Sequence, residues 1–373
     1  MMQADLFDPK PLEVTVPSSI ADAPKIDLHR HLLGSLTCEH VRELVDTHAL
    51  DVPDWSPAEL ASLLTITKPV AGLREFFRPW STLSKLLVSP EVAESIAYMT
   101  MRQAHDDKVV YAEFRVSWGM SPNARFNTEE FLHAVEAGFR RAETEFGVIG
   151  RIVLGITRHH FSRHTPEIRS WLWSGILRAA LRFQNRLVVG FDVSGVEDGY
   201  PARIYASELK QAREHGFGIT VHSGETTSAA EVRSVVEILR PDRIGHGLAA
   251  ARDEYLMSLM AEQRIAVEAC PTSNWLTGAV TDLKHHPLTI LHDRGVPITV
   301  NTDNPAICCT TLSREQSIVV QHMGATPEML TAFTSNTLDF MFAERELRDR
   351  LIARWFPSYK HAAAFSLGSE TLS

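Results

Sequence analysis

Four short motifs of this sequence combine the side chains that metal and acid–base chemistry require. The first is His29-Arg30-His31, in which one residue separates two imidazoles. Alternate residues of a β-strand point to the same face, so both rings could reach a single ion. On its own the pair is weak evidence, because such histidines are more often ordinary polar residues than metal ligands.

The other three motifs lie far along the chain. His222 and Glu225 occur in VHSGE, His246 lies between two glycines in RIGHG, and Asp303 occurs in VNTDNP. Each has an ordinary structural explanation: a hydrogen-bonded histidine at a strand end, a turn histidine, and an aspartate in a turn before Pro305. The two histidines of the first motif, the histidine of VHSGE and the aspartate nevertheless form an N3O ligand set that suits Zn²⁺.

These motifs coincide with the ends of predicted strands. Several short runs are apolar at consecutive positions, as strands buried on both faces of a parallel sheet require. Segments with helical spacing of apolar residues, such as 128–146, lie between the runs. The predicted strands are 25–29, 109–116, 151–157, 187–193, 218–222, 242–246, 265–270 and 297–302.

Strands that alternate with helices in this way predict a (β/α)8 barrel of the TIM type, with an open doubly wound sheet as the alternative. We expect residues 1–373 to form one catalytic domain. The first connection is long, about 80 residues, so we predict a helical insertion over residues 37–108 that could act as a lid. All four motifs fall at the C-terminal ends of predicted strands, which form the catalytic face of such a barrel. This coincidence favours a functional site.

The composition favours a small-molecule partner. The chain has 46 acidic and 37 basic residues, a formal net charge of −9, and no lysine- and arginine-rich run, which argues against nucleic acid and an anionic membrane surface. Its four cysteines form neither a CxxC pair nor a disulfide framework, as expected in a reducing compartment. There is neither an export signal nor an uninterrupted apolar run of about 18 residues. We therefore predict a cytoplasmic enzyme and leave its oligomeric state open.

Taken together, the motifs resemble those of the adenosine deaminase branch of the amidohydrolase superfamily. HxH, a glycine-bearing loop after strand four, HxGE, GHG and TDN follow one another in that family's order from Asp27 to Pro305. The resemblance implies a mononuclear, metal-dependent hydrolytic deaminase that acts on an aminopurine-like substrate. It also implies one Zn²⁺ ion per chain, with the ligands His29, His31, His222 and Asp303.

The same resemblance assigns roles around the metal. Glu225 would protonate a ring nitrogen of the purine, and His246 would orient and help to activate the attacking hydroxide, which a metal makes available by lowering the pKa of bound water toward ~7. Protonation offsets the loss of aromaticity, so a neutral carboxylic acid is useful there. Asp303 would accept a proton from the water and deliver it to ammonia. The backbone amide of Gly195 would meet another ring nitrogen.

Two departures from the family pattern concern the substrate. Leu33 stands where adenosine-specific relatives often carry an acidic residue that contacts a ribose hydroxyl, and Asn304 stands where many carry a second aspartate. An asparagine can donate to an unprotonated purine nitrogen, but a leucine cannot accept a hydrogen bond from a hydroxyl. We therefore expect 5′-deoxy or 5′-substituted aminopurine nucleosides to react at least as efficiently as adenosine. Adenine, a modified adenosine and a futalosine-type nucleoside are the candidate substrates.

Other functions remain open. A binuclear amidohydrolase acting on another ester, lactone or amide would share HxH and the last aspartate, but such relatives usually carry a bridging lysine on strand four, and residues 187–198 contain none. The cytidine deaminase fold requires HxE and PCxxC motifs that are missing. A barrel that only binds a ligand is the non-enzymatic alternative, and metal analysis would test it. Glu268, Ser273 and Asn274 either support a ligating histidine or only close a strand.

Overall fold

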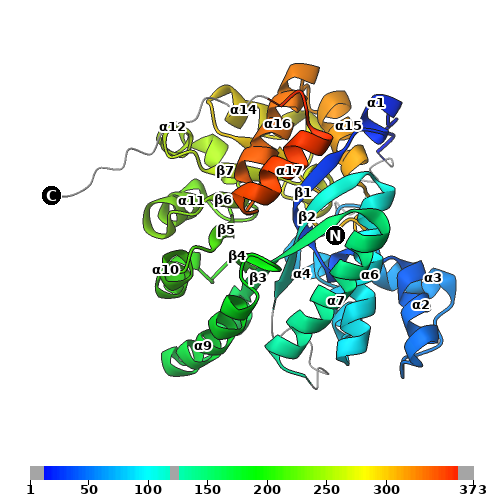
Figure 1. Cartoon of the computed structure of the whole chain (residues 1–373). Coiled ribbons are helices and arrows are strands. Elements are labelled where there is room, and N and C mark those ends of the chain that lie inside the picture. The colour runs from blue at the N-terminus through cyan, green and yellow to red at the C-terminus, as the bar shows by residue number, and fades with distance from the viewer. Residues whose placement is uncertain (1–11, 118–125, 360–373) are drawn as a thin grey trace, which may run out of the picture.

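The computed structural model describes residues 12–117 and 126–359, which form eight parallel strands in a single sheet (Figure 1). Each strand pairs with the next one along the chain. After the last strand the chain returns to the first, where the Asp303 amide donates to the His29 carbonyl and the His31 amide donates to the Asp303 carbonyl, both at 2.7 Å. The strands are β1 Lys25–His31, β2 Val109–Ser117, β3 Ile149–Thr157, β4 Val188–Ser194, β5 Gly218–Ser223, β6 Arg243–His246, β7 Ala266–Ala269 and β8 Ile298–Val300.

The predicted TIM-type barrel is confirmed. Strand order follows the sequence without the reversal that defines a doubly wound sheet, so the alternative fold is excluded. The predicted strand boundaries are close to the observed ones. β1 extends two residues further than predicted because the chain after β8 supplies hydrogen-bond partners for its end.

Five helices connect β1 and β2: α2 Cys38–His48, α3 Pro57–Leu64, α4 Leu73–Phe76, α5 Trp80–Leu86 and α6 Pro90–Asp106, all within the described residues. Thr37 and Ser56 cap α2 and α3 with their hydroxyl groups. α4 and α5 are separate helices, with Pro79 at the start of α5. Figure 1 shows α2 and α3 beside α6, which packs on α7 Thr128–Phe146. A lid function for this segment stays a prediction.

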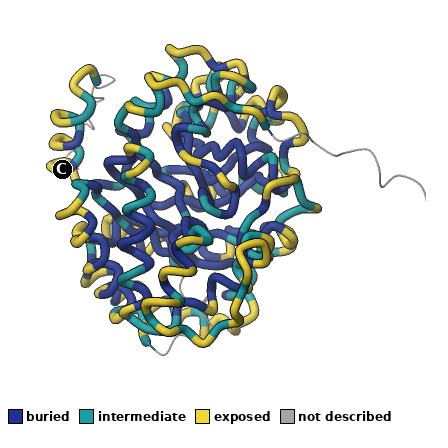
Figure 2. The backbone as a smooth tube through the Cα atoms, turned by 90° about the vertical axis from the view of Figure 1, so that its right-hand side faces the viewer, coloured by how far each residue is buried: buried dark blue, intermediate teal, exposed yellow. Residues whose placement is uncertain are grey.

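The remaining helices surround the barrel and close one of its ends. α16 and α17 pack on the beginnings of β1 and β2 through a small apolar cluster that includes Ile26, Tyr111 and Leu347. Buried backbone is concentrated in the centre of the molecule, and exposed residues lie on the outer helices and loops (Figure 2). These helices are α1 Ser18–Ala21, α8 Arg158–Phe161, α9 Pro166–Arg182, α10 Ala206–Glu214, α11 Ala229–Ser234, α12 Glu254–Glu262, α13 Pro271–Leu276, α14 Leu288–Asp293, α15 Leu312–His322, α16 Pro327–Phe340 and α17 Arg345–Trp355.

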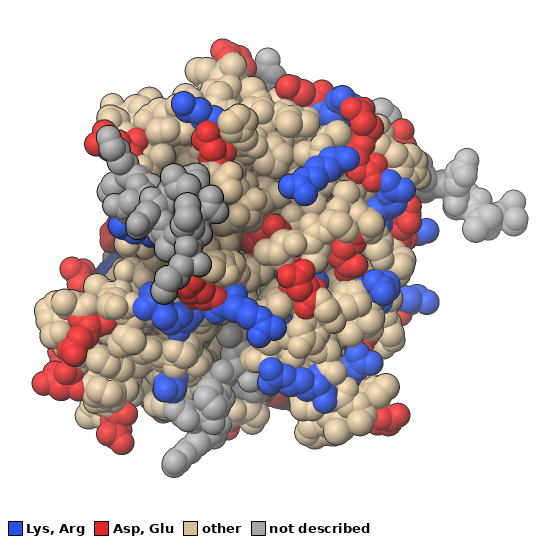
Figure 3. Space-filling view, turned by 180° about the vertical axis from the view of Figure 1, so that it is seen from behind, with Lys and Arg blue, Asp and Glu red and all other residues tan. Residues whose placement is uncertain are grey.

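The helices and the surface charge of the described residues bear on whether the chain crosses a membrane. None of the helices within residues 12–117 and 126–359 combines the length and hydrophobicity that crossing a bilayer requires. On the face drawn in Figure 3, aspartate and glutamate side chains are interspersed with lysine and arginine.

Candidate metal centre and active site

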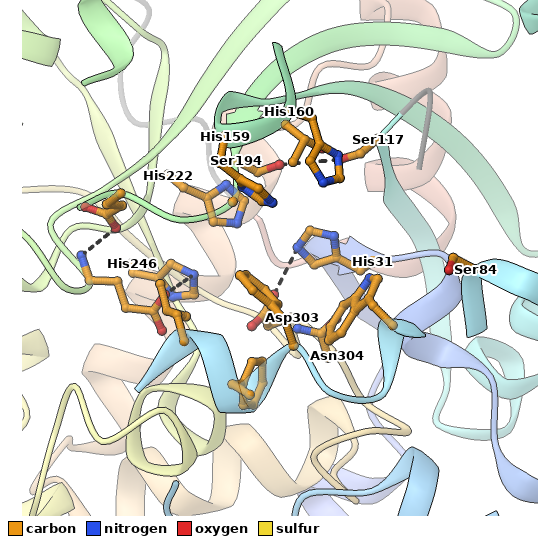
Figure 4. A pocket seen from close by; sticks show the side chains of 18 of the residues that line it. His31, Ser84, Ser117, His159, His160, Ser194, His222, His246, Asp303 and Asn304 are labelled. Carbon is orange, nitrogen blue, oxygen red and sulfur yellow. Dashed lines mark hydrogen bonds and ion pairs between the residues drawn. The ribbon is translucent and has the colours of Figure 1, made fainter. Parts of the chain in front are cut away.

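The histidine and aspartate motifs meet at the C-terminal ends of the strands. Side-chain atoms of His29, His222, His246 and Asp303 lie within 4.8 Å of one another, and all four residues are buried. His31 joins this group, because its Nε2 lies 3.2 Å from Oδ1 of Asp303. Figure 4 shows His31, His222, His246 and Asp303 directed into one pocket. The structure thus brings together all the residues that the sequence suggested for the metal and its attacking water.

Unusual backbone conformations position two of these residues. His246 has a φ of 66° and Asp303 a φ of 59°, in the left-handed region that non-glycine residues rarely adopt. Such a conformation costs about 1–3 kcal/mol, and the surrounding structure must maintain it. For Asp303 that restraint comes from the two backbone hydrogen bonds to β1. In both residues this backbone conformation accompanies a side chain that belongs to the cluster.

Buried polar groups orient the ligand candidates from outside. Nδ1 of His29 donates to Glu268 at 3.0 Å, and Nδ1 of His222 donates to Asp192 at 2.9 Å. The Ser273 hydroxyl donates to Oδ2 of Asp303 at 2.6 Å. A carboxylate partner on Nδ1 fixes the ring and leaves Nε2 free for a metal. Glu268 and Ser273 therefore support the cluster, whereas Asp192 escaped the sequence analysis because a single acidic residue in an apolar strand forms no motif.

The protonation states of His222 and Asp303 suit metal binding. Burial lowers the pKa of His222 to about 4, so its ring is neutral at neutral pH. Burial would raise the pKa of Asp303, but hydrogen bonds from His29 and His31 hold it well below its usual range. Neutral imidazoles and an ionised carboxylate are the forms that ligate a metal. Among the described residues, one cluster of potential ligands comprises His29, His222, His246 and Asp303, with His31 next to Asp303. Three imidazoles and one carboxylate fit a single zinc ion.

Glu225 lies beside the cluster and, unlike the ionised Asp303, has a raised pKa. Its carboxyl accepts hydrogen bonds from Oγ1 of Thr277 at 3.0 Å and Nδ2 of Asn274 at 3.4 Å. Burial and the negative charges of Asp303 and Glu197 raise its pKa well above the usual range. Glu225 is therefore a neutral acid that can give a proton to a ligand in the pocket.

Glu197 holds the loop that carries Glu225. Its carboxylate accepts from the backbone amides of Gly224 at 2.8 Å and Glu225 at 3.1 Å, and from the Thr227 hydroxyl. The side chain is buried. The sequence analysis did not identify this residue, because it acts on a loop that follows a different strand.

The cluster lies at one end of a pocket of about 320 Å³. Gly195 and Asn304 line this pocket, whereas among the described residues its lining does not include Leu33, which packs partly buried against the main apolar core. Gly195 has a φ of 92°, and a Cβ there would approach Nδ1 of His159 to 2.7 Å, so only glycine fits. Oδ1 of Asn304 is buried without a hydrogen-bond partner among the described residues. This oxygen is a hydrogen-bond acceptor and lies next to Gly34.

The rest of the pocket is made by residues that carried no motif. An apolar wall comes from α4 and α5, with Leu73, Phe76, Phe77 and Trp80. Polar side chains face it from the ends of other strands (Figure 4), namely Ser117, Thr157, His159, His160 and Ser194. An apolar wall with a few convergent polar groups is typical of a small-molecule site.

Comparison with known proteins places this chain among related sequences and structures. Residues 24–355 match the family model described as adenosine deaminase. An adenosine deaminase from Clostridium perfringens is 29% identical over 334 residues, which cover 89% of this chain and 98% of that protein. An aminodeoxyfutalosine deaminase from Acidothermus cellulolyticus is 33% identical over 321 residues, 84% of this chain and 86% of that protein. The crystal structure of an amidohydrolase from Burkholderia ambifaria with bound Zn superposes with a TM-score of 0.79 at 23% identity and covers 94% of both chains.

Proposed function

This chain belongs to the adenosine deaminase family, and from that premise we propose that it removes the amino group of a 6-aminopurine compound by hydrolysis. Water adds to the ring carbon that bears the amine, and ammonia leaves. The observation that carries the proposal is the position of Glu225, a buried neutral acid, beside a buried N3O cluster in the same pocket. A nucleophile and a proton donor for one aromatic ring are thereby available together.

The metal in this proposal is one zinc ion. When bound, it lowers the pKa of a water molecule to ~7 and so makes a nucleophile available at neutral pH. Support comes from the donor chemistry of the cluster and from the carboxylates behind its histidines. The proposed ligands are His29, His31, His222 and Asp303.

His246 and Asp303 have different roles toward the attacking water: His246 orients it, and Asp303 accepts its proton. Nδ2 of Asn274 lies 3.0 Å from Nδ1 of His246, so Nδ1 accepts and the ring proton is on Nε2, which faces the pocket. His246 therefore orients the attacking oxygen by donating a hydrogen bond to it. It does not take the proton of the water, which leaves Asp303 as the base. Asp303 then returns that proton to the departing amine, as the balance of the reaction requires.

Glu225 acts on the other side of the reacting ring. It transfers its proton to the ring nitrogen next to the attacked carbon, which offsets the loss of aromaticity in the transition state. We place a second ring nitrogen at the Gly195 amide and a third near Asn304. Leu33 is proposed to act on the substrate only indirectly, through the neighbouring core, because it packs against that core and is not among the residues that line the pocket.

The substrate class is supported by the names of the relatives. One similar protein is an adenosine deaminase and another an aminodeoxyfutalosine deaminase, so the shared chemistry is loss of a purine amino group from compounds that differ beyond the ring. A small-molecule partner and a cytoplasmic location are part of the proposal. In support of the latter, the described Cys38, Cys270, Cys308 and Cys309 are all free thiols.

Ammonia release from zinc-loaded protein tests the proposed function. Adenine, adenosine and 5′-deoxyadenosine are supplied in parallel, and the inosine- or hypoxanthine-type product is followed by its ultraviolet spectrum. We expect turnover of at least one. Protein that binds zinc and releases no ammonia from any 6-aminopurine would overturn the proposal in favour of a ligand-binding barrel.

A further inference from the structure

We propose that His286 is a positioning residue, which determines through the side-chain amide of Asn274 which atoms of His246 and Glu225 carry their protons. The inference rests on the deaminase function proposed above and deepens it, because these two residues are the proposed hydrogen-bond donor to the attacking water and the proposed ring acid. His286 and Asn274 are both buried, and neither is among the described residues that line the pocket. An effect of His286 on the reaction therefore has to pass through its neighbours.

The orientation of the Asn274 amide decides the positions of the two protons. The two ends of an amide are similar in shape, but the nitrogen only donates hydrogen bonds and the oxygen only accepts them. Nδ2 lies 3.0 Å from Nδ1 of His246 and 3.4 Å from Oε1 of Glu225. Both of these atoms accept, so the ring proton of His246 is on Nε2 and the carboxyl proton of Glu225 is on Oε2. A reversed amide would present its oxygen to the same two atoms and draw both protons onto them.

His286 fixes this orientation. The backbone amide of Leu288 lies 3.1 Å from Nδ1 of His286, and because a backbone N–H can only donate, Nδ1 is an acceptor. Burial lowers the pKa of His286 to about 3, so the ring is neutral and its one hydrogen is on Nε2. Nε2 lies 3.2 Å from Oδ1 of Asn274. Since Nε2 donates, only the oxygen of the amide suits that position, and Nδ2 is turned toward His246 and Glu225.

The two protons placed in this way are those that the proposed reaction uses. Nε2 of His246 and Oε2 of Glu225 are 3.6 Å apart, and both residues line the pocket, so their hydrogens are available to one ligand. The Thr277 hydroxyl donates to Oε1 of Glu225 at 3.0 Å, which supports the same position for the carboxyl proton. A continuous chain of hydrogen bonds thus runs from the backbone of Leu288 to both groups.

A purely structural role for His286 is the alternative, because its bond to Leu288 satisfies an amide at the start of α14. Two substitutions separate the roles. His286→Asn keeps an acceptor for the amide two residues later, as asparagine often does in turns, but it is too short to replace Nε2. His286→Gln instead keeps a donor near the position of Nε2.

Kinetics of these variants test the role in positioning. Each is assayed with whichever of adenine, adenosine and 5′-deoxyadenosine reacts fastest, and zinc content and melting temperature are measured in parallel. We expect kcat of His286→Asn to fall about 5–10-fold at unchanged KM, the size of one lost hydrogen bond, and kcat of His286→Gln to stay within about 2-fold. His285→Asn, at the adjacent position with an 84% exposed side chain, is the matched control and should not change kcat. An unaltered kcat in His286→Asn, or an equal loss in both His286 variants, would overturn the inference.

A double-substitution cycle tests the route through the amide. Asn274→Leu removes both ends of the amide, so the further change His286→Asn should cause no additional loss of kcat if His286 acts only through Asn274. Losses that simply multiply would overturn this route and favour the structural role.

The proton positions provide a readout that needs no turnover. Nitrogen-15 NMR of the histidine rings distinguishes the two neutral tautomers, and the signals of His246 are assigned by their loss in His246→Gln. We expect His246 of the zinc-loaded protein to have its proton on Nε2, and His286→Asn to shift part of the population to Nδ1. This result would stand even if no 6-aminopurine released ammonia, an outcome that overturns the proposed function alone. The same His246 tautomer in His286→Asn as in the unaltered protein would overturn the inference while leaving the deaminase function intact.

Discussion

Single residues in this site owe their protonation states to burial. The same removal from water raises the pKa of Glu225 and lowers that of His222, because the charged form is disfavoured in each case. One becomes a proton donor and the other a neutral ligand. The motif that contains both residues was recognisable in the sequence, because the two residues are only three positions apart. Asp192 and Glu197 were not, because each acts on a motif from a different strand.

Glu225→Gln tests proton transfer directly. The amide keeps nearly the same shape and can still contact Thr277, so we expect a folded protein with normal zinc content. It cannot give up a proton, and turnover should fall about 10²–10⁴-fold. Steady-state kinetics and elemental analysis on the same preparation provide the measurement. Near-normal kcat would reassign the acid.

His222→Ala tests the metal centre. Removal of one ligand should lower zinc content well below the one ion per chain expected for the unaltered protein, and turnover should fall with it. His164→Ala, a histidine on the exposed segment after α8, serves as the control and should keep both. Full zinc occupancy in His222→Ala would contradict the ligand assignment, and two ions per unaltered chain would favour a binuclear enzyme.

At the scale of elements, the loop after β4 positions the loop after β5. Glu197 forms that link through two backbone amides and a hydroxyl. The sequence predicted both strands because their apolar runs are local signals. It could not predict which loops would touch, nor that the separate helices α4 and α5 place Phe76 and Trp80 in the pocket wall. Those outcomes depend on contacts made across the barrel.

Glu197→Gln tests the link between the two loops. An amide has one acceptor oxygen where the carboxylate uses two, so one backbone amide of the loop loses its partner. We expect kcat to fall about 10-fold, by the loss of roughly one charge-assisted hydrogen bond, with zinc content unchanged. Asp198→Asn, at the exposed neighbouring position, is the matched control. If both variants had the kcat of the unaltered protein, Glu197 would have no role in positioning Glu225.

At the scale of the whole molecule, closure of the barrel assembles the site. β1 and the chain after β8 are about 270 residues apart in sequence, yet their backbone hydrogen bonds place His29, His31 and Asp303 together. This arrangement could be predicted from the sequence, because the C-terminal ends of parallel strands in a closed barrel all lie at one face. The buried charges of the interior were not predictable. Arg243 on β6, for example, lies between Glu113 at 2.5 Å and Glu268 at 2.8 Å, and the sequence does not state which side chains meet inside the barrel.

Global stability should depend on pH through a buried carboxyl outside the site. Glu315 on α15 accepts from the Thr272 amide at 3.0 Å and contacts the Thr310 hydroxyl, and burial raises its pKa to about 7. Between pH 4.5 and 7 the folded protein keeps this proton while the unfolded chain releases it. The free energy of unfolding therefore falls as pH rises through this interval, by about 3 kcal/mol for a shift of this size, and is constant above it.

Glu315→Gln isolates that contribution, because a glutamine is neutral at every pH and the other titrating groups cancel in the difference from the unaltered protein. We expect the variant to gain about 3 kcal/mol relative to the unaltered protein between pH 4.5 and pH 8, measured by urea unfolding at each pH. Glu346→Gln, on the exposed side of α17, should show no such pH-dependent difference. A difference between Glu315→Gln and the unaltered protein that stays constant with pH would mean that Glu315 is ionised in the folded state, with a counter-charge or water that offsets its burial.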